Sequence, residues 1–190
     1  AFGTNQVLKN AGFELRDGEI HALMGENGAG KSTLMKILTG VYTRDAGTVM
    51  VDGQEVVYKS PQEAEKAGIV FIYQELNVLF DLTVEENLFM GKEITKAFGV
   101  CDKKAMRAKA QEVMDKMGVN IPVNAVMSDL SVGQQQMVEI CKALMVDAKV
   151  LIMDEPTAAL TESETKVLFE VIESLQAKGV SIVYISHRME

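Results

Sequence analysis

Several residue types that would define a class of protein are scarce in this sequence. It holds no tryptophan, three prolines and two cysteines among 190 residues. Cys101 and Cys141 lie far apart, without a CxxC pair or a histidine at metal-binding spacing, so we expect reduced thiols of a cytoplasmic protein and no disulfide framework. No apolar run approaches the roughly 20 residues of a membrane span.

Basic charge is also scarce. The net charge of −8 argues against a nucleic-acid partner and against direct binding to anionic lipid. Hydrophobic residues make up 47% of the chain, which argues against disorder and predicts a globular domain with a sizeable core. If such an acidic protein binds phosphates, it must concentrate its positive field in a local structure.

The stretch from Gly25 to Ser32 is such a structure, because it fits the pattern Gly, four residues, Gly-Lys-Ser/Thr. An apolar run, residues 20–24, precedes it, and a helix-like segment follows. The glycines let successive N–H groups point at phosphate oxygens, and the helix start adds its positive dipole end. Lys31 would reach the outer phosphates and Ser32 would hold Mg²⁺. The expected nucleotide contacts are Gly25, Glu26, Asn27, Gly28, Ala29, Gly30, Lys31, Ser32 and Thr33.

Apolar strands alternate with amphipathic helices in the rest of the chain. We expect strands at residues 69–73, 150–153 and 181–185, and Gly179 should end a helix that starts at Glu162. This alternation predicts a mainly parallel sheet covered on both faces. Residues 7–8 and 13–15 suit a strand pair, and Asp52-Gly53 predicts a hairpin, so an antiparallel β flank is expected beside the sheet.

Residues 76–135 have a different, helical character. A capping box starts at Thr83, and residues 103–117 place several methionines on one helical face. We expect one domain over residues 1–190, truncated at both ends, with an α/β core in 1–75 and 136–190 and a helical subdomain in 76–135.

Polar residues follow directly on three of the apolar strands: Gln74, the pair Asp154-Glu155, and His187. Ligands of open α/β sheets collect at the carboxyl ends of the strands. Asp154 is placed to hold Mg²⁺ through water, and Glu155 to polarise an attacking water. Taken alone, the carboxylate pair could be a solvated turn and His187 could be structural. Beside the phosphate loop we favour catalysis, with His187 contacting the γ-phosphate.

These motifs stand in the order found in the ATP-binding cassette (ABC) ATPases, which the whole chain resembles. The resemblance rests on the phosphate loop, Gln74, the signature segment Leu130-Ser131-Val132-Gly133-Gln134, Asp154-Glu155-Pro156-Thr157, and His187. It implies a P-loop NTPase fold and hydrolysis of ATP with Mg²⁺. It also implies that Ser131, Gly133 and Gln134 meet the γ-phosphate on a second cassette, in a head-to-tail pair that ATP closes and hydrolysis opens.

Two further roles come from the resemblance. Phe2 lies where the family has an aromatic that stacks on adenine, although the second residue of the chain could equally be frayed. Gln74 would sense the metal and the attacking water. The segment after it, residues 75–90, would receive a helix from membrane permease subunits.

Within the family, the sequence is similar to the ATPases of bacterial monosaccharide importers. Val132 and Thr161 depart from the general cassette pattern but are common in that group. Such ATPases carry two cassettes in one polypeptide, so we expect a fragment of a protein on the cytoplasmic side of the membrane, served indirectly by a sugar-binding protein. The alternatives are a soluble non-transport ABC ATPase and a cassette that binds ATP as a switch with little turnover.

Overall fold

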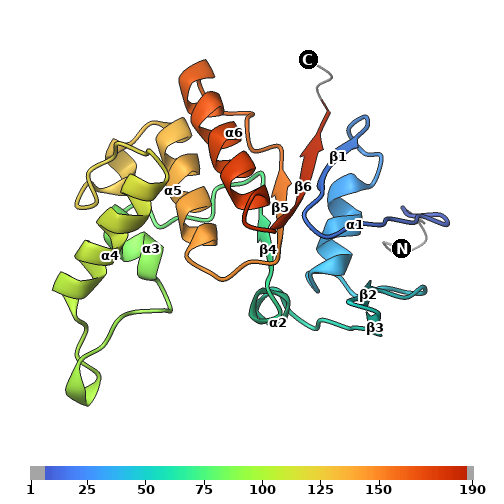
Figure 1. Cartoon of the computed structure of the whole chain (residues 1–190), viewed down its shortest axis with the longest axis horizontal. Coiled ribbons are helices and arrows are strands. Elements are labelled where there is room, and N and C mark those ends of the chain that lie inside the picture. The colour runs from blue at the N-terminus through green and yellow to red at the C-terminus, as the bar shows by residue number, and fades with distance from the viewer. Residues whose placement is uncertain (1–6, 188–190) are drawn as a thin grey trace. The chain divides into compact units, whose positions relative to one another are not determined.

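The computed structural model describes residues 7–187, and the expected adenine contact, Phe2, lies outside them (Figure 1). The chain forms two compact units. The first unit contains Ala1–Ile72, Asp147–Glu155 and Leu175–Glu190, and the second contains Tyr73–Val146 and Pro156–Ser174. The limits expected for the subdomains, at residues 75/76 and 135/136, stay a prediction.

A four-stranded parallel sheet forms the core of the first unit, with strand order β1-β6-β5-β4 (Figure 1). Its strands are β1 (Ile20–Met24), β4 (Ile69–Ile72), β5 (Val150–Asp154) and β6 (Ser181–Ser186). The two central strands, β5 and β6, are buried along almost their whole length, as their continuous apolar sequences require. The predicted strands are therefore confirmed.

One face of this sheet packs against helix α1 (Lys31–Leu38). Met35 of α1 is fully buried in a cluster with Ile152, Val183 and Ile185. At the start of helix α2 (Pro61–Lys66), the Ser60 side chain accepts a hydrogen bond from a first-turn N–H and proline occupies the first helical position.

The antiparallel flank is smaller than expected. Strands β2 (Met50–Val51) and β3 (Gln54–Glu55) form the predicted hairpin, and Asp52 and Gly53 both take the positive φ of a tight hairpin turn. The predicted strand pair at residues 7–8 and 13–15 is wrong, because residues 7–19 contain no strand. Phe13 and Leu15 instead contribute side chains to the core cluster without entering a β-ladder.

The second unit is helical. Its helices are α3 (Val84–Phe89), α4 (Lys103–Lys116), α5 (Val132–Leu144) and most of α6 (Glu162–Gln176), with short 3₁₀ turns at Ala97–Gly99 and Met127–Asp129. Capping interactions start each of the first three helices, including the box predicted at Thr83. Gly179 follows α6 with φ of 89°, as predicted. Over residues 7–187, no helix has the length and apolar character that crossing a membrane would need.

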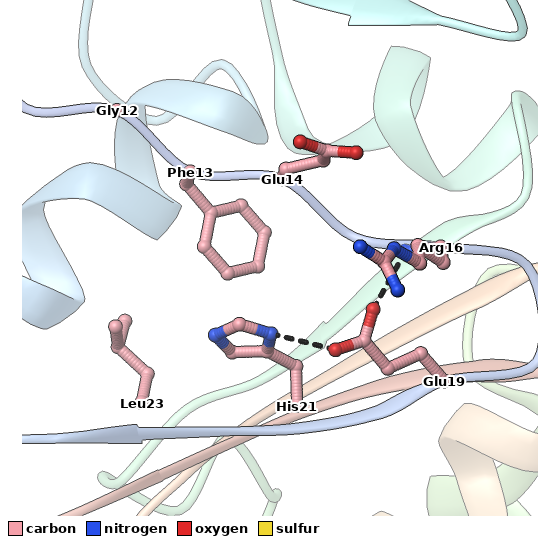
Figure 2. Close-up of a pocket in the computed structure, with 7 residues that line it drawn as sticks. All are labelled: Gly12, Phe13, Glu14, Arg16, Glu19, His21 and Leu23. Carbon is pink, nitrogen blue, oxygen red and sulfur yellow. Dashed lines mark hydrogen bonds and ion pairs between the residues drawn. The ribbon is translucent and has the colours of Figure 1, made fainter.

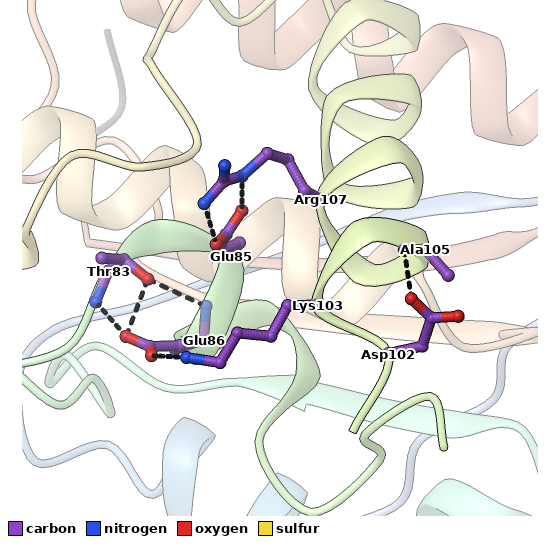
Figure 3. Close-up of polar contacts among 7 residues, drawn as sticks. All are labelled: Thr83, Glu85, Glu86, Asp102, Lys103, Ala105 and Arg107. Carbon is purple, nitrogen blue, oxygen red and sulfur yellow. Dashed lines mark hydrogen bonds and ion pairs between the residues drawn. The ribbon is translucent and has the colours of Figure 1, made fainter. Parts of the chain in front are cut away.

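Helices α3 and α4 are joined by charge as well as by packing. The buried Glu85 carboxylate accepts two hydrogen bonds from the Arg107 guanidinium, both at 2.7 Å (Figure 3). Met106, Ala110 and Met114 are buried along one face of α4, which confirms most of the predicted apolar stripe. Because a buried carboxylate requires a partner, this two-pronged contact fixes α4 against α3.

Candidate functional site

The predicted phosphate loop connects β1 to α1 and has the backbone that its glycines allow. Gly28 and Gly30 have positive φ values, of 83° and 92°, in a region that other residues rarely adopt. A side chain at Gly30 would also collide with Leu8, since a Cβ there would lie 2.7 Å from the Leu8 Cδ2 atom. The chain therefore turns tightly into the helix, and the N–H groups of the first turn of α1 have no partner within the helix.

Lys31 lies along the inside of this loop. Its Nζ donates hydrogen bonds to the carbonyl oxygens of Gly25 at 2.6 Å and of Glu26 at 3.0 Å. These two contacts hold the ammonium group beside the loop backbone. Within a chain of net charge −8, the loop thus combines a helix N-terminus with a fixed cation, as an anion site requires.

Ser32 and Asp154 meet next to the loop. Asp154 is the last residue of β5, is 4% exposed, and is hydrogen-bonded to the Ser32 side chain. Burial raises the pKa of Asp154 most, with a smaller contribution from the charge of Glu155. The Ser32 hydrogen bond and the charges of Lys36 and Lys31 oppose that rise. The structure therefore brings two hard oxygen donors together at the start of α1.

Glu155 and His187 form the second pair. The Glu155 carboxylate and the His187 Nδ1 atom are 2.5 Å apart, and only 11% of the Glu155 side chain is exposed. Glu155 has a φ of 50°, a strained value for a residue with a side chain, and its N–H donates to the carbonyl of Ile185. Strain of this kind is concentrated at functional sites, and here it coincides with a carboxylate that contacts a histidine.

The remaining predicted residues belong to the second unit. Gln74 is exposed and follows β4 by two residues. Ser131 is the N-cap of α5, and its hydroxyl accepts from the Gln134 N–H while the Gln134 side chain accepts from the Ser131 N–H. Gly133 is buried in the first turn of that helix, and Val132 beside it is 55% exposed. This box holds the signature segment at a helix N-terminus.

A separate cavity of about 410 Å³ lies elsewhere in the first unit (Figure 2). The Glu19 carboxylate there accepts from the Arg16 N–H and bonds His21, whose ring packs edge-on against Phe13. The Arg16 N–H, followed by His21, lowers the pKa of Glu19. The cavity is lined by Gly12, Phe13, Glu14, Arg16, Glu19, His21 and Leu23. None of the predicted site residues lines it, so it plays no part in the site derived above.

Comparison with known proteins supports the resemblance to ABC ATPases found in the sequence. The family model for the ABC transporter matches residues 8–158. The chain belongs to the ABC transporter family. Its fold is that of the family's ATP-binding cassettes, an α/β P-loop NTPase fold with a parallel core sheet, an antiparallel sheet and helices. A crystal structure of a nucleotide-free ATP-binding cassette from an ABC transporter is 29% identical, with a TM-score of 0.86 over the whole chain and 78% of the cassette.

A second cassette structure extends this comparison. The dimeric post-hydrolysis state of the cassette MJ0796, bound to ADP and Pi, is 27% identical with a TM-score of 0.81, over 96% of this chain and 81% of that one. Cassettes of this fold are thus known with nucleotide and as pairs.

Curated relatives cover the chain completely. The ribose import ATP-binding protein RbsA of Bacillus licheniformis is 59% identical over 190 residues, and that of Streptococcus agalactiae serotype Ia is 57% identical. This chain spans 38% and 39%, respectively, of the length of these relatives.

Two residues of the second unit were not predicted. Asn87, 1% exposed, bonds four backbone groups of residues 79–83 and so fixes the loop before α3. Glu164 caps α6 from a Thr-x-x-Glu sequence that starts at Thr161. That spacing could have revealed the cap, whereas a single buried asparagine carries no local signal.

Proposed function

We propose that this chain is an ATP-binding and hydrolysing cassette that powers import of a monosaccharide through a membrane permease. The observation that carries the proposal is the convergence, within one unit, of the Lys31 loop, the Ser32–Asp154 contact and the Glu155–His187 contact. A phosphate cradle, a site for a metal and a base for water are the parts that phosphoanhydride hydrolysis needs.

Ser32 and Asp154 are the residues that would hold Mg²⁺. Their hydroxyl and carboxylate oxygens suit this hard cation, which uses few protein ligands and keeps several waters. When bound, the ion supplies neutralisation of the charge that develops on the β- and γ-phosphates. Asp154 supplies a buried negative charge toward it, and the Ser32 hydrogen bond orients that carboxylate.

In this proposal, Glu155 accepts the proton of the attacking water, and His187 orients the Glu155 carboxylate. The hydrogen bond to His187 fixes the carboxylate, and the His187 side chain is 36% exposed. Its other ring nitrogen would contact a γ-phosphate oxygen. Gln74 would complete this group by contacting the metal and the water, and Phe2 would stack on adenine. Ser131, Gly133 and Gln134 would bind the γ-phosphate on a second cassette.

The whole protein would act at the cytoplasmic face of the membrane. Its partners would be permease subunits, a second cassette in the same or another chain and, indirectly, a sugar-binding protein, with no nucleic acid. The names of the relatives, ribose import ATP-binding proteins, support this assignment over a soluble ABC ATPase. We further propose that residues 1–190 form one nucleotide-binding domain, and that its α/β core and its helical subdomain have the limits expected from the sequence.

The test is steady-state ATP hydrolysis by this chain with and without Mg²⁺. We expect Mg²⁺-dependent turnover that rises faster than linearly with protein concentration, because each site needs a second cassette. Lys31→Ala should abolish it. Glu155→Gln should retain ATP binding while turnover falls by about 10²- to 10⁴-fold, the range for loss of a general base. Hydrolysis by Glu155→Gln at the parent rate would show that Glu155 is not the base. Tight ATP binding without turnover in the parent chain would favour the alternative of a cassette that binds ATP as a switch.

A further inference from the structure

A carboxylate from the start of α6 lies against the first turn of α5. A methyl group placed on Gly133 would overlap the Oε2 atom of Glu164 and would lie 2.9 Å from its Cδ and Oε1 atoms. Both residues belong to the second unit. Glu164 thus occupies the space that a side chain at position 133 would need.

The Glu164 carboxylate is held in that place. Its Oε2 atom accepts hydrogen bonds from the Thr161 N–H and the Thr161 hydroxyl, both at 2.8 Å. The Thr161 hydroxyl in turn accepts from the Glu164 N–H at 3.3 Å. A side chain at position 133 would displace the carboxylate from the Thr161 N–H and hydroxyl, so the cap that starts α6 would keep only its bond from the Glu164 N–H.

The contact joins two segments that matter for the proposed reaction. Gly133 is the second helical residue of α5, within the signature segment. Thr161 ends the stretch that begins directly after Glu155, and α6 starts at the next residue. A displacement of the signature turn would therefore be passed to the segment that follows the proposed base.

We propose that Glu164 is a positioning residue that locks the start of α6 to the signature turn, and that this contact requires glycine at position 133. The link to turnover rests on the function proposed above, whereas the contact itself does not. The proposal assigns Gly133 a role within its own cassette, in addition to the expected phosphate contact.

A double-mutant cycle in thermal unfolding tests the contact. Alanine has a higher helix propensity than glycine, so Gly133→Ala alone should stabilise α5 if nothing opposes the new methyl group. We expect the opposite in the parent, a fall in Tm of about 3 to 6 °C. With Glu164→Ala already present, Gly133→Ala should leave Tm unchanged or raise it. Equal shifts from Gly133→Ala in both backgrounds would overturn the proposal.

Glu162→Ala is the matched control, because it removes the same charge from the exposed side of the same helical turn. Gly133→Ala should lower Tm in that background as much as in the parent. A loss of the effect in both backgrounds would mean that charge at the start of α6, and not the contact, is responsible, and would also overturn the proposal.

ATP hydrolysis tests the positioning role. Glu164→Ala should lower kcat several-fold and leave the KM for ATP unchanged, since Lys31 and its loop are untouched. Glu164→Gln should restore kcat, because its amide oxygen can accept from Thr161. A kcat for Glu164→Ala equal to that of Glu162→Ala would overturn this role. If the parent chain shows no Mg²⁺-dependent turnover, the proposed function is wrong. The double-mutant cycle in thermal unfolding still tests whether Glu164 and Gly133 interact.

Discussion

In the first unit the one buried carboxylate among the described residues is that of Asp154, whereas the second unit buries Glu85 and Glu139. Asp154 bonds a serine hydroxyl beside the phosphate loop. Glu85 bonds Arg107, and Glu139 accepts from the Asn77 N–H. A buried carboxylate is costly in either unit. In the second unit, the buried carboxylates hold helices and loops in place. In the first unit, the buried carboxylate of Asp154 lies where the proposed reaction needs a negative charge.

Asp154→Asn should give the largest effect and the clearest separation of the two uses. The amide keeps the shape and can still accept from Ser32, but it removes the charge that would hold Mg²⁺. We expect kcat for ATP hydrolysis to fall by about 10²- to 10³-fold. Stability should not fall, because burial disfavours the carboxylate, as its raised pKa indicates.

The check combines steady-state hydrolysis with thermal unfolding, and Asp147→Asn on an exposed residue of the same unit serves as control. A Tm for Asp154→Asn well below that of the control would place Asp154 with the structural carboxylates and remove the contrast between the units.

Asn87→Ala should have the next largest effect, on folding. Asn87 bonds both backbone groups of Leu79 and the carbonyls of Leu82 and Thr83, at 2.8 to 3.4 Å. Alanine would leave the Leu79 N–H without its partner and would remove the amide's bonds to three carbonyls, each of which keeps a backbone donor, at a cost of about 2 to 3 kcal/mol. In a domain of this size that corresponds to a Tm lower by about 4 to 12 °C.

Asn124→Ala, on an exposed residue of the same unit, is the control for this measurement. Equal melting temperatures for the two variants would contradict the view that buried polar groups of the second unit carry its loops.

How much the sequence predicts also differs between the units. The first unit's site could be read directly, because each group follows an apolar strand and parallel strands end at one edge of the sheet. The Ser32–Asp154 and Glu155–His187 contacts follow from that topology. The error at residues 7–19 arose because Phe13 and Leu15 are partly buried by side-chain packing alone, which periodicity cannot distinguish from a strand.

In the second unit, only local signals were readable. Each of the two capping boxes joins residues three positions apart, Thr83 with Glu86 and Ser131 with Gln134. The box at Thr83 was predicted from the sequence. The contact of Gly133 with Glu164 and that of Asn77 with Glu139 join residues far apart in the chain, on elements whose packing no motif encodes. Such contacts depend on how helices meet, and a single sequence does not specify that.

Glu139→Gln should have the smallest effect, and it sharpens the comparison through pH. Burial raises the pKa of Glu139, against the opposing Asn77 N–H and the charge of Lys142, and the Oε2 atom has no hydrogen-bond partner. Because the pKa of Glu139 is higher in the folded than in the unfolded protein, the stability that the protein has below the unfolded-state pKa is lost as the pH rises through the folded-state pKa. Glutamine keeps an acceptor for Asn77 without a charge. At pH 8 its Tm should therefore exceed that of the parent by about 2 to 4 °C, and the difference should vanish near pH 4.

Glu112→Gln is the control of opposite sign. Lys116, followed by Lys109, lowers the pKa of this exposed carboxylate to about 2. Its contribution to stability is therefore present above its unfolded-state pKa and is lost as the pH falls through its folded-state pKa. Glu112→Gln should thus give no rise in Tm at pH 8. A Glu139→Gln variant that behaves like Glu112→Gln, with no gain at pH 8, would mean that Glu139 is stabilising as an anion. The second unit would then hold its buried charge without cost, and the contrast with Asp154 would have to rest on activity alone.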